Sequence, residues 1–169
     1  MQRQGLRVLG AIVTIAAIII ALGAMGYVSV PYITPQTGDY DTTTVTITNT
    51  TASEPPHVEA RIADTRQKRY VGLSDTDQLG PDEGMLFTYD QEQNHTYVMR
   101  KMDFGIDIVY IGADNRINTI HHAPKPDPGV DGNTLEYPGR GKYVLEVPYN
   151  WTTRNGVSTG DRVQIDGNV

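Results

Sequence analysis

Acidic side chains beside basic ones are the first candidates for chemistry in this sequence. Asp103 and Asp107 stand close to the basic pair Arg100 and Lys101, and Glu146 lies inside an apolar run. Two carboxyl groups with a basic neighbour can perform acid–base cleavage of a sugar or peptide bond. The same residues also have a structural interpretation, which we favour. In it, Asp107 caps backbone amides or pairs with Arg100, and Glu146 points outward or forms an ion pair.

Histidines are the only residues that suggest a metal site, because the chain has no cysteine. The lack of cysteine excludes a thiolate zinc site, a disulfide framework and a cysteine nucleophile. His121 and His122 are weak metal-ligand candidates, since adjacent strand residues point to opposite faces. A histidine that is exposed or satisfied within the core is the simpler interpretation. No cofactor is predicted, because the chain has no Gly-rich phosphate loop.

Aromatic side chains cluster near the C-terminal third of the chain and include Tyr137, Tyr143, Tyr149 and Trp151. If exposed, they could stack on sugar rings or anchor a protein partner. Packing in the core is the alternative, and it suits Tyr143 and Trp151 best.

Short runs rich in Val, Ile and Tyr predict the domain that must position these side chains. Strands are expected at residues 57–63, 85–87, 96–99, 106–111, 117–123, 143–147 and 163–165. A short helix is expected over residues 66–70, capped by Asp64 or Thr65 and ended by Gly72. Residues 124–141 are rich in Gly and Pro and predict one long loop. These elements predict a mainly β (α+β) fold, a compact antiparallel β barrel or sandwich with one or two short helices.

The N-terminal residues predict how this domain is attached to the membrane. Residues 8–30 contain neither charge nor proline and are long enough to cross a hydrocarbon core about 30 Å thick. Arg3 and Arg7 precede them, so residues 1–7 are expected in the cytoplasm and the β domain, residues 57–169, outside the cell. A cleaved signal peptide is the alternative, but its apolar region would span only about 7 to 15 residues. We therefore predict a single-pass anchor in the cell membrane.

A Pro- and Thr-rich segment, residues 31–56, is expected to tether the domain to this anchor. Within it, residues 44–48 alternate polar and apolar side chains and predict a strand equally well. Three Asn-Xaa-Thr triplets, at Asn49, Asn94 and Asn150, would accept N-linked glycans on an exported domain. About one such triplet is expected by chance in a chain of this composition.

Charge composition limits the partners of the domain. Beyond residue 30 there are 20 acidic and 12 basic side chains, and this negative balance disfavours nucleic acid as a partner. The acids are mostly Asp, 14 against 6 Glu, and the bases are mostly Arg, 10 against 4 Lys. Such a composition is similar to that of proteins from extreme halophiles, in which strongly hydrated carboxylates keep the surface soluble.

Several blocks in a fixed order resemble the family known as domain of unknown function 192. The blocks are Lys68-Arg69-Tyr70-Val71-Gly72-Leu73, Gly84-Met85-Leu86-Phe87, Tyr97-Val98-Met99-Arg100, Ile106-Asp107-Ile108-Val109-Tyr110-Ile111, Tyr143-Val144-Leu145-Glu146-Val147, Gly156 and Gly160-Asp161. The resemblance spans about residues 57–166 and implies a compact, mainly β domain, often behind a signal sequence or membrane anchor. It implies no particular reaction.

The chain departs from the family pattern at three places. Ser74 stands where relatives commonly have Met, and Gly105 replaces a common Pro. Val98, Lys101 and Met102 replace a common Trp, Asn and Thr of one stretch. If the Trp contributes to a pocket in relatives, that pocket is altered here.

The convergence of the family blocks predicts a ligand site near Arg69, Arg100, Lys101 and Asp107. These basic groups would steer an acidic ligand to an otherwise acidic surface. The leading hypothesis is a non-catalytic binding or accessory module at the cell envelope, for an unknown ligand or protein. The alternatives are an envelope hydrolase that uses the paired carboxylates and a structural subunit of a membrane assembly.

Overall fold

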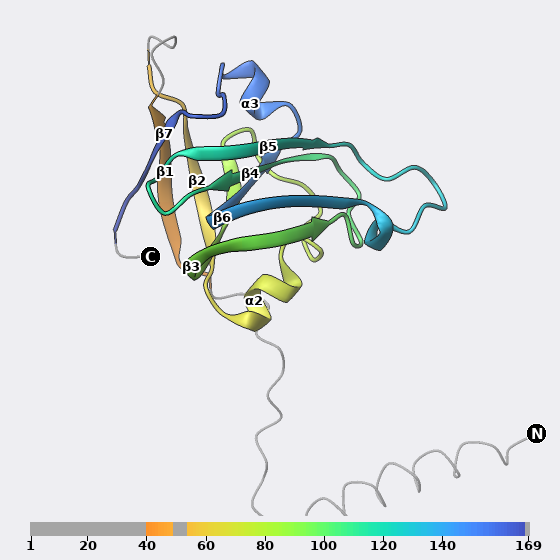
Figure 1. Cartoon of the computed structure of the whole chain (residues 1–169). Coiled ribbons are helices and arrows are strands. Elements are labelled where there is room, and N and C mark those ends of the chain that lie inside the picture. Colours follow the sequence, from red (N-terminus) through yellow and green to blue (C-terminus); the bar gives the residue numbers. More distant parts are fainter. Residues whose placement is uncertain (1–39, 49–53, 168–169) are drawn as a thin grey trace, which may run out of the picture. The chain divides into compact units, whose positions relative to one another are not determined.

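The computed structural model describes residues 40–48 and 54–167, which form one seven-stranded sheet (Figure 1). Its strands run in the order β5-β4-β6-β3-β2-β1-β7. The strands are β1 (Thr42–Thr48), β2 (His57–Ala63), β3 (Glu83–Val98), β4 (Ile106–Ile111), β5 (Ile117–Ala123), β6 (Glu136–Pro148) and β7 (Arg162–Ile165). Three short helical segments accompany them, namely α2 (Arg66–Val71), the 3-10 turn η1 (Gly132–Thr134) and α3 (Trp151–Arg154). The prediction of a mainly β fold with few short helices is confirmed.

The sheet is antiparallel except between β2 and β3, which run parallel. Helix α2 forms the crossover between these two strands, and a parallel pair requires such a connection. The sequence prediction of an antiparallel arrangement missed this pair, although the helix itself was expected, because strand patterns do not reveal which strands become neighbours in the sheet.

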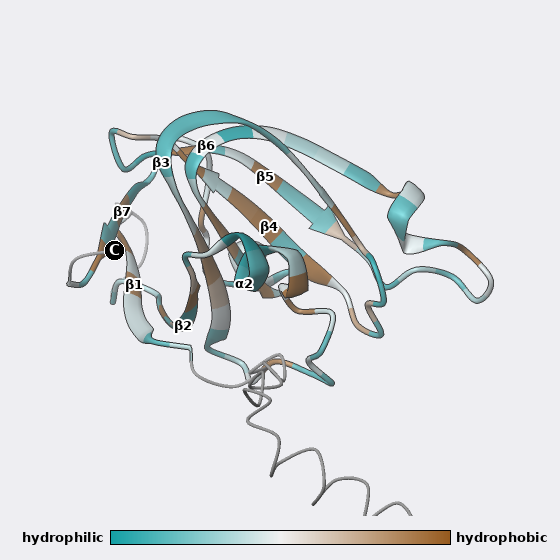
Figure 2. Ribbon diagram, turned by 90° about the horizontal axis from the view of Figure 1, so that it is seen from below, coloured by the Kyte–Doolittle hydropathy of each residue, from teal (hydrophilic) through white to brown (hydrophobic). Residues whose placement is uncertain are grey.

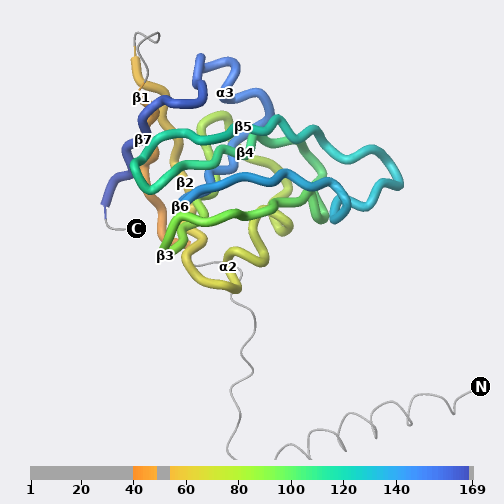
Figure 3. The backbone as a smooth tube through the Cα atoms, in the orientation of Figure 1, coloured from red at the N-terminus to blue at the C-terminus, as the bar shows by residue number. Residues whose placement is uncertain are grey.

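The sheet curls until its two edges approach each other, as the tube in Figure 3 also shows. A single bridge joins Arg116, just before β5, to Arg162 at the start of β7. The Ile117 amide donates to the Asp161 carbonyl at 3.0 Å beside this bridge. The sheet of the described domain is therefore a curled half-barrel, not a closed barrel or a sandwich of two sheets.

Burial explains the sequence pattern of each strand. β4 reads Ile-Asp-Ile-Val-Tyr-Ile and is buried along its whole length, because it lies between β5 and β6 with both faces covered. β2 alternates, with Val58 and Ala60 fully buried and Glu59 exposed, since one of its faces meets solvent. Figure 2 shows the hydrophobic residues concentrated in β4 and in the adjoining parts of the sheet.

Apolar side chains form one cluster on each face of the sheet. The first cluster includes Val109, Leu145, Val147 and Trp151. The second includes Phe87, Met99, Ile108, Tyr110 and Val144. Side chains that alternate along β4 and β6 thus supply both clusters, and the second cluster is the one that borders the site described below.

The expected helix matches the structure, whereas the expected tether and long loop differ from it. Helix α2 begins after Thr65, whose side chain accepts a hydrogen bond from the Lys68 amide, and ends at Gly72, which has φ of +53°. Residues 44–48, for which a strand and a linker were expected equally, belong to strand β1. The sheet therefore begins within the expected tether. The loop predicted over residues 124–141 ends earlier, because β6 already begins at Glu136.

The predicted membrane anchor, residues 8–30, lies outside the described residues, as do residues 1–7, 31–39 and 49–53. Within the part of the chain that the structure describes, no helix is both long and apolar enough to cross a membrane.

Candidate functional site

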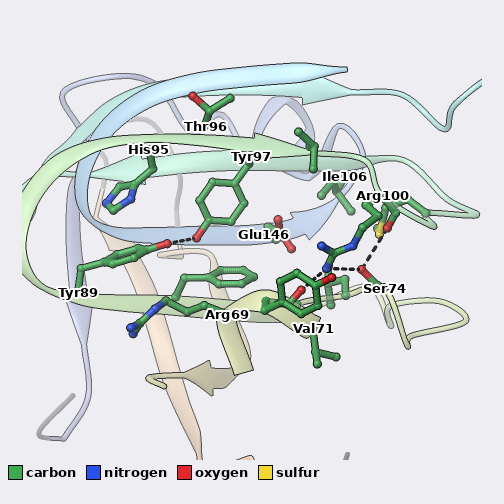
Figure 4. Close-up of a pocket in the computed structure, with 16 residues that line it drawn as sticks. Arg69, Val71, Ser74, Tyr89, His95, Thr96, Tyr97, Arg100, Ile106 and Glu146 are labelled. Atoms are coloured by element: carbon green, nitrogen blue, oxygen red, sulfur yellow. Dashed lines mark hydrogen bonds between the residues drawn. The ribbon is translucent and has the colours of Figure 1, made fainter. Parts of the chain in front are cut away.

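A bend in β3 creates the principal pocket of the domain. The pairing of β3 with β6 shifts register between Thr88 and Gln93, and the strand turns back on itself there. Consequently Tyr97 packs edge-on against Phe87 with ring centroids 5.0 Å apart, although ten residues separate them. Tyr89 stacks face to face on His95, with ring centroids 3.7 Å apart. Figure 4 shows the two halves of β3 facing each other across the pocket.

Helix α2 and the turn after it close the pocket on a third side. Gly72 lets the chain pass close to the Phe87 ring, since a Cβ at Gly72 would lie 3.4 Å from Phe87 Cζ. The cavity holds about 250 Å³ and is lined by α2, both halves of β3, the segment after β3, and β6. This volume lies just below the range of about 300–1,000 Å³ that is usual for small-molecule sites. The pocket is thus suited to a small ligand.

Glu146 supplies the most unusual group in this pocket. It lies on β6 opposite Met85 of β3 and Ile108 of β4, and both of these neighbours are fully buried. Glu146 itself is 4% exposed, and burial raises the pKa of its carboxyl to about 8. Among the described residues, none donates a hydrogen bond to this carboxyl or forms an ion pair with it. At pH 7 this carboxyl is therefore mainly neutral, and no described residue pairs with it.

Tyrosine hydroxyls and a histidine complete the inner wall. The Tyr89 and Tyr97 hydroxyls share a hydrogen bond of 2.9 Å. Burial raises the pKa of Tyr97 well above its ordinary value and raises the pKa of Tyr89 as well. Burial lowers the pKa of His95. All three side chains are consequently neutral near pH 7 and offer ring faces and hydroxyl oxygens to a ligand.

Two arginines supply the positive charge of the pocket. The Arg69 guanidinium lies over the Tyr89 ring at 4.9 Å, and its Nη1 donates to the Asp64 and Thr88 carbonyls at 2.6 and 2.8 Å. These contacts fix the orientation of the guanidinium but leave its charge uncompensated. No carboxylate among the described residues forms an ion pair with Arg69.

Arg100 reaches the pocket from the segment after β3. It lies over the Tyr70 ring at 4.2 Å, and its Nη2 donates to the Tyr70 carbonyl and contacts the Ser74 hydroxyl at 3.5 Å. Ser74, one of the departures from the family pattern, thus helps to orient Arg100. Like Arg69, Arg100 pairs with no carboxylate of the described chain.

Of the four predicted ligand-binding residues, the structure brings Arg69 and Arg100 to this pocket but not Lys101 or Asp107. Lys101 is exposed, in a turn with φ of +55°. Asp107 is fully buried below α3 and does not pair with Arg100. The expectation that all four form one site is therefore not met by this geometry.

Asp107 instead organises the start of α3. Its Oδ1 accepts from the Asn150 amide at 2.9 Å and from His122 Nδ1 at 2.8 Å. Its Oδ2 accepts from the amide and the hydroxyl of Thr152 at 2.9 and 2.6 Å. This is the amide-capping role that the structural interpretation predicted, and it leaves the carboxylate no free position for chemistry.

The three candidate catalytic carboxylates do not converge. Asp103 is 89% exposed at its side chain and lies 3.5 Å from Lys125. Asp107 faces the side of the sheet that carries Val147, whereas Glu146 faces the side that carries Ile108. A hydrolytic pair built from these residues would need both carboxyl groups on one face.

The two adjacent histidines also point apart, as predicted for neighbouring strand residues. His121 Nε2 lies 2.7 Å from the Pro138 carbonyl, whereas His122 contacts Asp107. Within the described ranges, no group of three or more His, Asp or Glu side chains has the arrangement of a metal site.

Other predicted positions are spread over the domain. Asn94 is exposed on β3, Asn150 is half-buried before α3, and Asn49 lies outside the described residues. Tyr143 and Trp151 are core residues, whereas Tyr149 is exposed and Tyr137 packs beside the second cluster. The aromatic residues near the C-terminal third therefore do not form one binding surface.

Sequence analysis missed Tyr89, His95 and Tyr97 as pocket residues. Tyr89 and His95 belong to the polar run between the predicted strands 85–87 and 96–99, and Tyr97 lies in the second of these strands; β3 spans all of them without a break. The aromatic residues at alternate positions could have indicated a strand there. The bend that brings them together depends on the pairing of β3 with β6, which the local sequence does not show.

Comparison with known proteins agrees with this architecture. Residues 47–165 match the model of the family DUF192, described as an uncharacterised ACR, and the chain belongs to this family. No curated protein matches the chain.

Two crystal structures are similar to the chain. The first is a protein from Sinorhizobium meliloti 1021, provisionally named a transcription regulator, with a TM-score of 0.69 and 26% identity over 78% of this chain and 98% of that one. The second is a protein of unknown function from Novosphingobium aromaticivorans, with a TM-score of 0.66 and 28% identity over 77% of this chain and 89% of that one.

Proposed function

We propose that this chain is a non-catalytic binding module of the cell envelope whose pocket takes a small organic anion. The observation that carries the proposal is the pair Arg69 and Arg100, which line one cavity without a carboxylate partner among the described residues. Guanidinium groups bind carboxylate and phosphate through parallel hydrogen bonds. Each arginine spends one terminal nitrogen on the protein and keeps other N–H groups for a ligand.

Long-range electrostatics support the same ligand class. The chain beyond residue 30 has 20 acidic and 12 basic side chains, so an anion is repelled by most of the domain. Two uncompensated arginines at one cavity create a local positive region that concentrates an anion there. The same acidic balance disfavours binding of nucleic acid by this chain, since phosphate backbones need clustered basic groups.

The remaining parts of the proposal concern where the domain is located in the cell. An uncleaved helix over residues 8–30, with Arg3 and Arg7 on the cytoplasmic side, would hold the domain outside the cell. The preference for Asp over Glu and for Arg over Lys supports a salt-rich environment. If the domain lies outside the cell, Asn49, Asn94 and Asn150 are candidate glycan acceptors.

Native mass spectrometry tests the proposal directly. The full-length chain is extracted from the membranes of its own organism in high salt and mild detergent, together with Arg69→Ala and Arg100→Ala variants. We expect the wild-type chain to carry a small-molecule mass that both variants lose. Arg66→Ala is the matched control, because Arg66 is exposed on the same helix and does not line the pocket.

Two results would contradict the proposal. A wild-type chain without any added mass would favour a structural subunit, which cross-linking in intact cells would then identify through a constant neighbour. An added mass that both arginine variants retain would move the site away from this pocket.

A further inference from the structure

The pocket contains two kinds of uncompensated group, and they are of opposite character. Arg69 and Arg100 contribute positive charge, whereas Glu146 contributes an acid with no partner in the described chain. A ligand that carries only an anionic group would satisfy the arginines and leave the Glu146 carboxyl without a charged partner. The arginines alone therefore do not account for the chemistry of the pocket.

Glu146 is directed into the cavity and not into the sheet. Its oxygen atoms have no hydrogen-bond partner among the described residues, yet no buried side-chain oxygen of those residues is sealed away from both solvent and partners. The carboxyl therefore reaches the open space of the pocket, and Figure 4 shows it pointing there between Tyr97 and Arg100. A buried polar group of this kind costs free energy until something enters to bind it.

The walls around Glu146 suit a positively charged group. Phe87 and Tyr97 contact each other edge to face, and Tyr89 joins its hydroxyl to that of Tyr97. Aromatic faces and phenolic oxygens both attract an ammonium ion, especially where water is excluded. An ammonium group at this position would form an ion pair with the carboxylate and contact the rings.

We infer that the ligand is a small zwitterion, with an ammonium group bound by Glu146 and an anionic group bound by Arg69 and Arg100. This inference rests on the proposed binding function and specifies its ligand class. A primary amino acid with its amino and acidic groups separated by a short carbon chain has this chemistry. Such a ligand offers an anionic partner to the arginines and a cationic partner to Glu146.

The protonation of Glu146 supplies a signature for this ligand. The neighbouring groups that carry or could carry charge are Arg69 from α2, Tyr89, His95 and Tyr97 from β3, Arg100 from the segment after β3, and Tyr110 from β4. Burial raises the pKa values of the three tyrosines and lowers that of His95, so none of these four titrates between pH 7 and 8. Glu146, with a pKa of about 8, is the group that does.

Binding of an ammonium group requires the ionised form of Glu146, so it must release a proton at pH 7. Affinity should then rise about tenfold per pH unit from pH 6 to 8 and level off above that. A ligand with only an anionic group gives the opposite sign, because ionised Glu146 repels it.

Calorimetric titration of the full-length chain in detergent separates these ligands. The probes are ω-amino acids from glycine to 6-aminohexanoate, with butanoate and butylamine as partners that each lack one charge. Titrations at pH 6, 7 and 8 in two buffers of different ionisation enthalpy count the protons. We expect at least one ω-amino acid to bind at least tenfold more tightly than butanoate or butylamine, with release of nearly one proton at pH 7.

Variants locate the effect at Glu146. Glu146→Gln should weaken binding of the ω-amino acid at least tenfold and remove its pH dependence, while butanoate binding is retained. Glu59→Gln is the control, since Glu59 is an exposed residue of β2 outside the pocket. The proton count is made on the wild-type chain and stays decisive even if Glu146→Gln fails to fold.

The inference is overturned if butanoate binds as tightly as every ω-amino acid, if no proton is released, or if none of the amino acids binds. The first two results leave an anion-binding module intact. Failure of the proposed function itself has a different signature, namely a ligand mass that Arg69→Ala and Arg100→Ala both retain.

Discussion

Asp107 and Glu146 occupy adjacent register positions of the paired strands β4 and β6, yet their carboxyl groups point to opposite faces of the sheet. Asp107 pairs with Val147, and Glu146 pairs with Ile108. The first carboxylate is saturated by four hydrogen bonds, whereas the second has none from the described residues. Two acids that look equivalent in the sequence thus have different roles, one in folding and one at the pocket.

The saturation of Asp107 predicts a folding defect in Asp107→Asn. The amide nitrogen of Asn cannot accept the hydrogen bonds that one carboxylate oxygen receives from Thr152 or Asn150. We expect a loss of about 2–4 kcal/mol in the free energy of unfolding, measured by urea denaturation. Asp103→Asn, at an exposed surface pair, should change it by less than about 1 kcal/mol. Unchanged stability of Asp107→Asn together with lost turnover of a sugar or peptide would restore the catalytic alternative.

The buried acid predicts a pH dependence of stability. Burial raises the pKa of Glu146 from its ordinary value of 4.5 to about 8 in the folded chain, so the folded chain holds this proton more tightly. Its contribution is present below pH 4.5 and is lost as the pH rises to about 8, with a slope of about 1.4 kcal/mol per pH unit. The difference in unfolding free energy between wild type and Glu146→Gln, measured without ligand from pH 5 to 8, should change with this slope. Glu59→Gln should follow the wild type throughout, and parallel curves for Glu146→Gln would contradict the assignment.

The close packing of the bent pair of strands β3 and β6 predicts that a larger residue at Gly139 destabilises the domain. A Cβ at this position would lie 2.5 Å from the Tyr110 ring, whose hydroxyl donates to the Tyr137 carbonyl at 2.5 Å. Gly139→Ala should therefore lower the free energy of unfolding by about 1–3 kcal/mol. Arg140→Ala, at the next and exposed position, should cost less than about 1 kcal/mol even though it removes the pair with Glu92. Equal stability of the two variants would show that the ribbon can move away from Tyr110.

The proposed anchor predicts membrane retention of the full-length chain. We expect it to stay in the membrane fraction through high-salt and carbonate washes and to need detergent for release. Ile18→Arg with Ile19→Arg should abolish retention, because each arginine costs about 2.5–3.5 kcal/mol at the centre of a membrane helix. Gln2→Arg, outside the apolar segment, should leave retention unchanged. Release of the wild-type chain by salt alone would contradict the anchor.

Local sequence signals predicted the parts of the fold that local forces determine. β2, β4 and β5 have the predicted bounds, and in β2 and β4 alternation or continuous burial explains why. The cap at Thr65 and the ending at Gly72 defined α2 for the same reason.

The bent ribbon escaped prediction because its residues resemble a loop. Pro138, Gly139 and Gly141 are typical of turns, yet they lie in β6, where close contacts with Tyr110 and with the backbone of Ile111 leave no room for a Cβ at the two glycines. The arginines of the pocket were predicted from sequence blocks, whereas the role of Glu146 was not. Its position away from the hydrogen-bond donors of the described residues depends on contacts between distant strands, which the spacing of residues does not reveal.

One strand supplies both opposing walls of the pocket, because Phe87 and Tyr97 belong to the two halves of β3. The width of the cavity is therefore governed by the angle of a single bend between Thr88 and Gln93, while each half keeps its pairing with β6. A molecule bound between the two halves of β3 would contact both of them and limit the motion of that bend. Occupancy would then be reported by slower amide exchange at residues 89–93, with no change at the far edge of the sheet.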